Sequence, residues 1–193
     1  MSEAAGGELT VRVATSLKTI PPQAWDACAN PHALMPALTD EAPLAQDRDN
    51  PFVSHAFLSA LEASGCIGGR TGWSPAYLLV ENGTGALLAC APSFLKSHSQ
   101  GEYVFDHAWA DAYERASGRY YPKIQVAAPF TPATGPRLLV ADGPQAEAAR
   151  ETLIAGLAAL CGQAGASSVH VTFAQEPDFA ALLANGYLER HDL

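Results

Sequence analysis

Apolar and polar residues alternate from Leu9 to Ala14, and this period of two is typical of a half-buried strand. Apolar runs at 76–81 and 86–95 flank an Asn-Gly turn, and such a turn between two apolar runs predicts an antiparallel hairpin. Extended apolar segments at 120–128 and 169–173 predict two more strands. The pattern therefore predicts a sheet whose strands are spread along the whole chain.

Apolar residues recur with helical spacing between these strands. The helix before residue 65 has a plausible N-cap in Asn50, with Pro51 at its first position. The longest predicted helix is rich in alanine, which favours helix formation. The predicted helices are 22–29, 50–65, 106–117, 144–163 and 177–184.

Two short segments complete the predicted order of elements. Residues 137–140 are expected to be extended, and a further strand is expected to begin at Tyr187. A hairpin followed by alternating strands and helices predicts an α/β domain over residues 1–193. Its sheet is mixed and mostly antiparallel, with helices on both faces. An apolar content of 48% is enough for a sizeable core.

The formal charge of −9 argues against nonspecific binding to nucleic acid, which needs Lys and Arg to replace phosphate counterions. The four cysteines show no metal-binding spacing, and no set of His, Cys and carboxylates predicts a metal site. The first residues lack the pattern of a signal peptide, and no apolar run approaches the about 18 residues of a membrane span. We therefore expect a cytoplasmic protein with reduced thiols and no metal.

Residues 96–140 concentrate the side chains that could carry chemistry. His98 beside Glu102 is a candidate base for an amine nucleophile, although both residues also fit an ordinary polar strand end. Tyr121 is a candidate donor to a substrate carbonyl or to a leaving thiolate, although aromatic core packing is the more common outcome for such a residue. The candidate catalytic residues are His98, Glu102 and Tyr121.

The same segment predicts a binding wall. Asp106 also fits the N-cap of a helix, and Lys123 also fits a solvated strand position. The candidate substrate-binding residues are Lys96, Tyr103, Asp106, Trp109, Tyr120, Lys123 and Phe130.

A Gly-Pro-Arg turn closes this segment. Gly135 permits close backbone approach and Arg137 can pair with phosphate, so Thr134, Gly135 and Arg137 are candidate cofactor-binding residues. A strand-ending turn with a surface arginine is the alternative. Proline offers no N–H, and Asp142 at the start of the long helix would oppose an anion.

The order of elements resembles the GNAT acyltransferase fold. The closest resemblance is to the Fem-like peptidoglycan biosynthesis or recognition proteins, a family of predicted N-acyltransferases within the GNAT superfamily. The segments that carry it are NPFVSHAFLSALEASG (50–65), TGWSPAYLLVE (71–81), residues 91–140 and GYLERHDL (186–193). The acetyl-CoA signature of simple GNAT enzymes is absent, and the turn at 131–137 is similar to the Gly-Pro turn of Fem-type aminoacyltransferases.

This resemblance implies transfer of an acyl or aminoacyl group from acyl-CoA or aminoacyl-tRNA to a small-molecule or peptide amine. The alternative is a non-catalytic half-domain that holds a peptidoglycan precursor or a partner protein with residues 103–130. Members of the family have two GNAT-like halves, and residues 1–193 resemble the N-terminal half. An unpaired last strand would also expose a sheet edge, through which we expect a homodimer.

Overall fold

The computed structural model describes residues 7–31, 49–104 and 106–190. Its strands form two four-stranded sheets. The first sheet contains, in spatial order, β1 (Leu9–Ala14), β3 (Tyr77–Asn82), β4 (Leu87–Ala91) and β7 (Leu139–Val140). The second contains β2 (Trp73–Pro75), β5 (Ser93–Lys96), β6 (Lys123–Val126) and β8 (Val169–Val171). All pairs are antiparallel except β6 with β8, so the predicted mixed, mostly antiparallel arrangement is confirmed.

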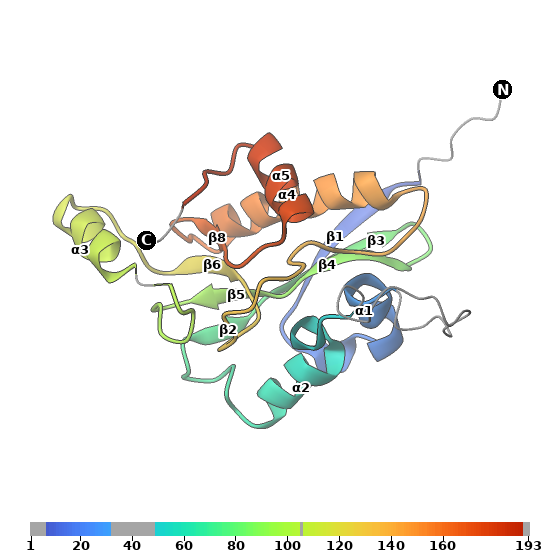
Figure 1. The fold of residues 1–193 in the computed structure, drawn as a ribbon, viewed down its shortest axis with the longest axis horizontal. Helices are drawn as coiled ribbons and strands as arrows, with labels where there is room; N and C mark the ends of the chain where they lie inside the picture. The colour runs from blue at the N-terminus through green and yellow to red at the C-terminus, as the bar shows by residue number, and fades with distance from the viewer. Residues whose placement is uncertain (1–6, 32–48, 105, 191–193) are drawn as a thin grey trace, which may run out of the picture.

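Helices cover both faces of the sheets, as predicted (Figure 1). On one face α1 (Pro22–Ala29) and α2 (His55–Ala63) enclose a core that contains Trp25, Tyr77 and Phe94. On the other face α4 (Ala146–Gln163) and α5 (Glu176–Ala184) enclose a second core that contains Ile124 and Leu157. Helix α3 (His107–Arg115) projects from one end of the second sheet. No helix within the described residues is long and apolar enough to cross a membrane.

The predicted hairpin forms, but its second arm divides between the two sheets. The turn is correct, and Asn82 Oδ1 accepts hydrogen bonds from the backbone N–H groups of Thr84 and Ala86. The second arm was expected to be one strand over 86–95 and instead breaks at Pro92 into β4 and β5. Proline has no N–H for the ladder, which explains the break.

Two other expectations differ from the structure. The helix expected over 50–65 is interrupted at Ser54, because the Ser54 side chain caps α2 while Asn50 caps a separate short turn at Pro51–Val53. The strand expected from Tyr187 is wrong for 187–190, which have no regular structure, and 191–193 lie outside the described residues.

Strands β6 and β7 occupy neighbouring sheets and are joined by residues 127–138. This connecting segment lies beside the residues that follow β8, where Gly135 forms an isolated parallel bridge with Ala174. Gly135 N donates to Phe173 O at 3.0 Å, and Gln175 N donates to Gly135 O at 3.1 Å. The bridge therefore fixes the Gly135 turn against the start of α5.

Candidate functional site

Four charged side chains form a cluster that is closed to solvent. Lys123 Nζ lies 2.8 Å from Glu102 Oε2 and 2.7 Å from Asp106 Oδ2, and Lys96 Nζ lies 3.7 Å from Glu102 Oε1. The side chains of all four have a relative accessibility of 0%. We call Lys96, Glu102, Asp106 and Lys123 the buried ionic cluster. It has no formal net charge, which is the condition under which charges are tolerated in an apolar interior.

The position of this cluster follows from strand register. Lys96 on β5 is directly opposite Lys123 on β6, so both side chains lie on the same face of the second sheet. Ile124, the next residue, lies on the opposite face and belongs to the core beneath α4. The loop after β5 returns over the lysine face and brings Glu102 and Asp106 to their ammonium groups.

Hydrogen bonds fix the protonation state of Asp106. Burial disfavours its ionised form, but hydrogen bonds from Lys123, Ser99 and Tyr120 outweigh burial and lower the pKa of Asp106 to about 2. Burial raises the pKa of Glu102, against the opposing charge of Lys123. Burial also lowers the pKa of Lys96 to about 8.

The cluster and Tyr120, which donates a hydrogen bond to Asp106, bring together five of the residues predicted for catalysis or substrate binding. Tyr121 joins them through Ser99, whose Oγ lies 2.8 Å from the Tyr121 hydroxyl. Asp106 occupies the N-cap position of α3, but its side chain makes no capping bond because the carboxylate is turned to Lys123. The expectation of a solvated Lys123 is wrong, since its side chain is fully buried. The five residues are Lys96, Glu102, Asp106, Tyr120 and Lys123.

The remaining predicted residues of this segment lie outside the cluster. Lys96 Nζ lies 3.6 Å from the Trp73 ring centroid, and the centroid of the Phe130 ring lies 5.4 Å from that of Trp73. His98 is half-buried, and its ring occupies the space beside Gly72 where a Cβ would stand. Tyr103 and Trp109 are more than half exposed, at 54% and 58%.

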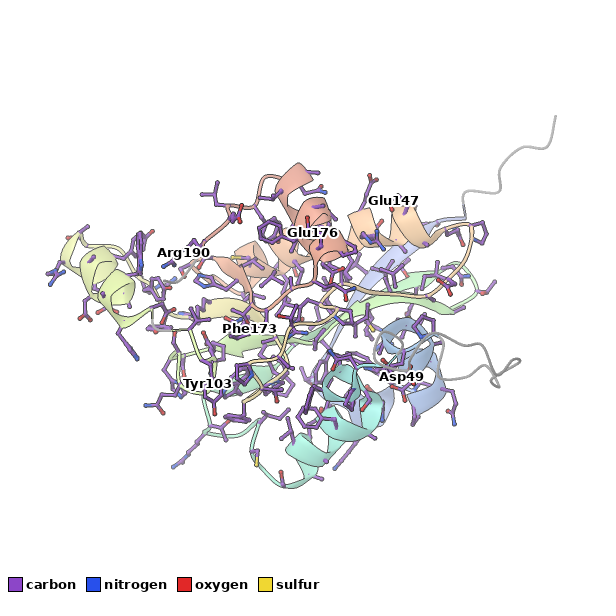
Figure 2. The ribbon with its side chains drawn as sticks, in the orientation of Figure 1. Asp49, Tyr103, Glu147, Phe173, Glu176 and Arg190 are labelled. Atoms are coloured by element: carbon purple, nitrogen blue, oxygen red, sulfur yellow. The ribbon has the colours of Figure 1, made fainter. Side chains whose placement is uncertain are left out.

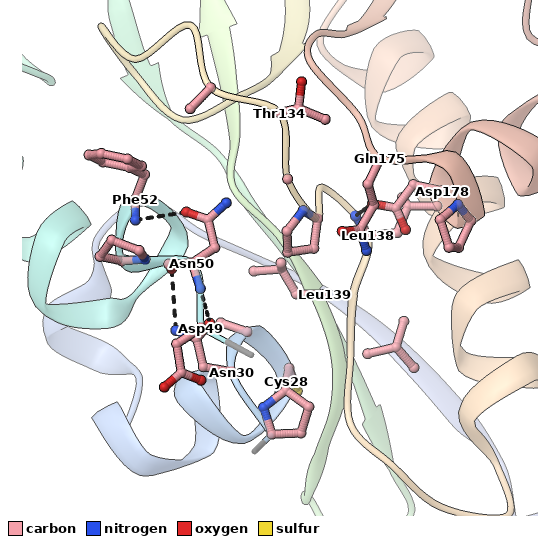
Figure 3. Close-up of a pocket in the computed structure, with 18 of the residues that line it drawn as sticks. Cys28, Asn30, Asp49, Asn50, Phe52, Thr134, Leu138, Leu139, Gln175 and Asp178 are labelled. Carbon is pink, nitrogen blue, oxygen red and sulfur yellow. Dashed lines mark hydrogen bonds between the residues drawn. The ribbon is translucent and has the colours of Figure 1, made fainter. Parts of the chain in front are cut away.

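A separate cavity of about 560 Å³ opens between α1, the Gly135 turn and the N-terminus of α5 (Figure 3). Thr134 and Gly135 line it, so it contains two of the predicted cofactor-binding residues. Asp49, Asp178 and Arg150 also line it. We call this cavity the α1–α5 pocket.

Two asparagines that sequence reasoning missed build one wall of this pocket. Asn30 Oδ1 accepts from Asn50 N at 2.9 Å, and Asn30 Nδ2 donates to Asn50 O at 3.3 Å. Asn50 Oδ1 accepts from Phe52 N at 3.0 Å, so both the backbone and the side-chain oxygen of Asn50 are held (Figure 3). Within the described residues, no hydrogen bond uses Asn50 Nδ2, which leaves one fixed amide donor beside Gly135.

Arg137 is turned away from this pocket and is fully buried. Its guanidinium donates to the carbonyl oxygens of Ala133 at 2.7 Å, Thr172 at 2.9 Å and Pro136 at 3.0 Å. Asp178 accepts from the backbone N–H of Arg137 at 2.6 Å. Burial lowers the pKa of Arg137 to about 10, against the opposing charge of Asp178. The alternative of a surface arginine is therefore wrong, and the guanidinium braces the turn that presents Thr134 and Gly135.

Gly135→Ala is expected to lower the free energy of unfolding by about 1–2 kcal/mol. The new Cβ would overlap Asn50 Nδ2, and moving that side chain breaks the cap on Phe52 N. Urea unfolding measures the effect. Gly83→Ala is the control, because nothing lies within 4 Å of its Cβ position. Equal stabilities for the two variants would contradict this account of the Gly135 contact.

The described residues contain no group of three or more His, Cys, Asp or Glu placed to hold a metal ion. Three cations near the two sites are bound within the chain, Lys96 and Lys123 to carboxylates and Arg137 to carbonyls, whereas Arg150 lines the pocket. The arrangement thus offers a closed structural cluster and, apart from it, an open pocket with one free amide donor and two carboxylates.

Comparison with protein families gives a match over most of the chain. The FemAB-like family, described as peptidoglycan biosynthesis/recognition, matches residues 16–193. The chain belongs to this family. The predicted Fem-like membership is thereby confirmed, and it supports an N-acyltransferase of GNAT/Fem type.

Two solved structures are similar to this FemAB-like chain. One is an acetyltransferase from Trypanosoma brucei, with 13% identity, a TM-score of 0.46 and coverage of 96% of each chain. The other is the aminoglycoside 6'-N-acetyltransferase AAC(6')-Ih from Acinetobacter baumannii, with 13% identity, a TM-score of 0.49 and coverage of 96% and 95%. No curated protein matches the chain.

Proposed function

We propose that this FemAB-like chain performs N-acyl transfer in the α1–α5 pocket, using an activated acyl carrier as donor and an amine as acceptor. The observation that carries the proposal is the fixed, unpaired Nδ2 donor of Asn50 beside Gly135, in a cavity of about 560 Å³. Amide donors held in place before the reaction stabilise the negative charge that develops on a carbonyl oxygen under attack.

The donor is acyl-CoA or aminoacyl-tRNA, and its reactive carbonyl occupies the space between Asn50 and Thr134. The absence of a side chain at Gly135 lets Asn50 Nδ2 approach the turn, because a Cβ at this position would overlap that atom. Arg137 supports the turn from behind through three carbonyl oxygens and does not face the pocket. The carrier is therefore recognised by the shape of the turn, with Arg150 as the cation among the residues that line the pocket.

The acceptor amine attacks the carbonyl carbon, and a base must take its proton. Asp178 already accepts hydrogen bonds from Arg137 N and Leu138 N, whereas Asp49 is exposed at the pocket rim. Asp49 is therefore the base in this proposal. The carrier leaves as its thiol or hydroxyl form when the tetrahedral intermediate collapses.

Titration calorimetry with acetyl-CoA, longer acyl-CoAs and aminoacyl-tRNA tests the proposal. Asn50→Asp keeps the capping oxygen and removes the Nδ2 donor, so we expect carrier binding to be retained while the transfer rate falls about 10²–10³-fold. Asn185→Asp, on an exposed helix end, is the matched control. Binding of none of the carriers by the wild-type chain would overturn the proposal.

A recognition role without catalysis is the second candidate. It is favoured by the closure of the buried ionic cluster, which removes Glu102 and Lys123 from contact with solvent. Carrier titration separates the two, because a recognition module binds acceptor and no carrier. That residues 1–193 form one half of a two-domain protein stays a prediction. The homodimer through a sheet edge also stays a prediction, which light scattering at rising concentration can check.

A further inference from the structure

A second cavity, of about 840 Å³, runs along the free edge of β8. Helices α4 and α5 form one wall with Ala158, Cys161, Leu182 and Leu183. Tyr103, Val104 and the segment 186–190 also line the cavity. We call this cavity the β8 groove. Its lining is mainly apolar although the chain as a whole carries a formal charge of −9.

The edge of β8 presents free peptide groups to the groove. Ile124 N donates to Ser168 O at 2.9 Å, and Thr172 N donates to Val126 O at 3.2 Å. In a parallel ladder only alternate residues of a strand bond to the neighbour, so Val169 and Val171 direct their peptide groups away from β6. No hydrogen bond within the described residues uses these groups, and a row of this kind is a template for another strand.

The walls fit the alternating side chains of an extended strand. Successive side chains of a strand point to opposite faces. A strand paired with β8 would therefore place alternate side chains against Leu182 and Leu183 of α5 and the others against Tyr103. Leu183 is 42% exposed and Tyr103 is 54% exposed, so both have apolar surface that a bound strand could bury.

Among the described residues that line the groove, Arg190 is the arginine that could bind a carboxylate, and Glu189 is the acidic residue. The Arg190 guanidinium carbon lies 4.3 Å from the centroid of the Trp109 ring, which holds it against α3. Its charge acts on Tyr120 and His170, so it lies toward the end where β6 and β8 begin (Figure 2). Burial and the charge of Lys123 lower the pKa of His170 to about 4, which leaves this histidine neutral. Arginine pairs with a carboxylate through two parallel hydrogen bonds.

The other end of the groove leads to the α1–α5 pocket. Phe173 and Ala174 line the groove, and the next residue, Gln175, lines the pocket. A strand antiparallel to β8 begins at this end and finishes beside Arg190. The segment 186–190 also lines the groove, so the space beside β8 fits a single strand, whereas a second copy would bring a whole sheet edge.

We propose that the β8 groove binds an extended peptide antiparallel to β8, with its C-terminal carboxylate on Arg190 and its amino end directed to the α1–α5 pocket. Val169 and Val171 hold the peptide backbone, and the two walls select apolar side chains at alternate positions. The role of this peptide as acyl acceptor rests on the proposed function. Its binding does not, because no carrier takes part.

Titration calorimetry of the full chain with the hexapeptide Ala-Val-Thr-Val-Tyr-Val tests this proposal in the absence of any carrier. We expect the free acid to bind about tenfold more tightly than the C-terminal amide, since the amide loses the charged pair with Arg190. Arg190→Gln removes this preference. Arg115→Gln, an exposed cation at the end of α3, retains it. Hydrogen exchange at Val169 and Val171 N–H slows when the acid is bound.

Val171→Pro removes one outward N–H and leaves the bonds to β6 intact, so it abolishes peptide binding while circular dichroism shows a retained fold. Equal affinities for acid and amide, or no binding of the acid at 1 mM by a folded chain, would overturn the proposal. So would a dimer that Val171→Pro dissociates, since the edge would then belong to a second copy. Carrier titration is independent, so failure of peptide binding and failure of the proposed transferase are distinguishable.

Discussion

Lys123→Met is expected to lower the free energy of unfolding by about 3–5 kcal/mol. The lysine ammonium is the closest cation to both carboxylates of the buried ionic cluster, at 2.8 Å from Glu102 and 2.7 Å from Asp106. Methionine fills much of the same volume but leaves two carboxylates facing each other without solvent. The cost comes from uncompensated charge rather than from lost packing, and urea unfolding at pH 7 measures it.

Acidification distinguishes this cause from a packing defect. In the wild type the pKa of Asp106 is about 2, below its unfolded value, so Asp106 adds stability above about pH 4 that is lost as the pH falls toward 2. Without Lys123 the folded-state pKa values of both carboxylates rise above their unfolded values, and the variant gains stability on acidification. The difference between variant and wild type therefore shrinks between pH 7 and pH 4.

Lys96→Met is the matched control. Lys96 Nζ is 3.7 Å from Glu102, and burial already lowers the pKa of Lys96 to about 8, so its charge is less well compensated. Its Nζ lies 3.6 Å from the Trp73 ring centroid, and methionine loses this cation–π contact. We expect a loss below about 1.5 kcal/mol. Equal losses for the two variants, or a loss for Lys123→Met that does not change with pH, would show that the cluster is not held by its charges.

Arg137→Met is also expected to cost about 3–5 kcal/mol. The substitution leaves the carbonyl oxygens of Ala133, Pro136 and Thr172 without their donor in a buried site. It also removes one of the two cations, Arg150 being the other, whose charges oppose the rise that burial causes in the pKa of Asp178. Thermal unfolding followed by circular dichroism measures the loss. Arg119→Met is the control, because its single bond to Gly165 O lies at the surface and is worth less than about 1 kcal/mol.

Arg137→Lys tests whether the guanidinium also contacts the carrier. Lysine keeps the charge but cannot reach three carbonyl oxygens with the geometry of the planar fork. We expect a loss of stability smaller than that of Arg137→Met. We expect carrier affinity to fall only to the extent that the substitution makes the Gly135 turn less rigid. A stable Arg137→Lys variant that had lost all carrier binding would instead assign the guanidinium to the carrier phosphates, as the sequence motif first suggested.

Local patterns predicted the elements that depend on nearby residues. The period of two at Leu9–Ala14 identified β1, and the Asn82 turn identified the hairpin, because both are determined within a few residues. The long helix was predicted in the same way, and it begins at Ala146. The missing strand after Tyr187 shows the limit of this reasoning, since an extended segment becomes a strand only when it has a partner.

The two sites depend on contacts that no local pattern contains. The sequence indicated Lys96, Glu102, Asp106 and Lys123 as polar residues of one segment, but only the pairing of β5 with β6 shows that they neutralise one another. Arg137 was expected at the surface or on a phosphate, because its burial depends on the packing of α5.

Asn30 and Asn50 form one wall of the α1–α5 pocket, and they come from segments on either side of residues 32–48. The only local signal was that Asn50 precedes a proline, which predicted its capping bond and not its contact with Asn30. An asparagine pair of this kind cannot be recognised before the fold brings the two residues together.

The buried ionic cluster also restricts how the chain can misfold. A slip of one residue between β5 and β6 would turn Lys123 to the face where Ile124 packs beneath α4. A bare ammonium would then be buried among apolar side chains with no carboxylate in reach, at a cost of several kcal/mol. Apolar residues at these positions would tolerate the slipped pairing. The four charges thus select a single strand register, and a variant that replaced all of them with apolar residues would be expected to fold with less uniform pairing even if it were as stable.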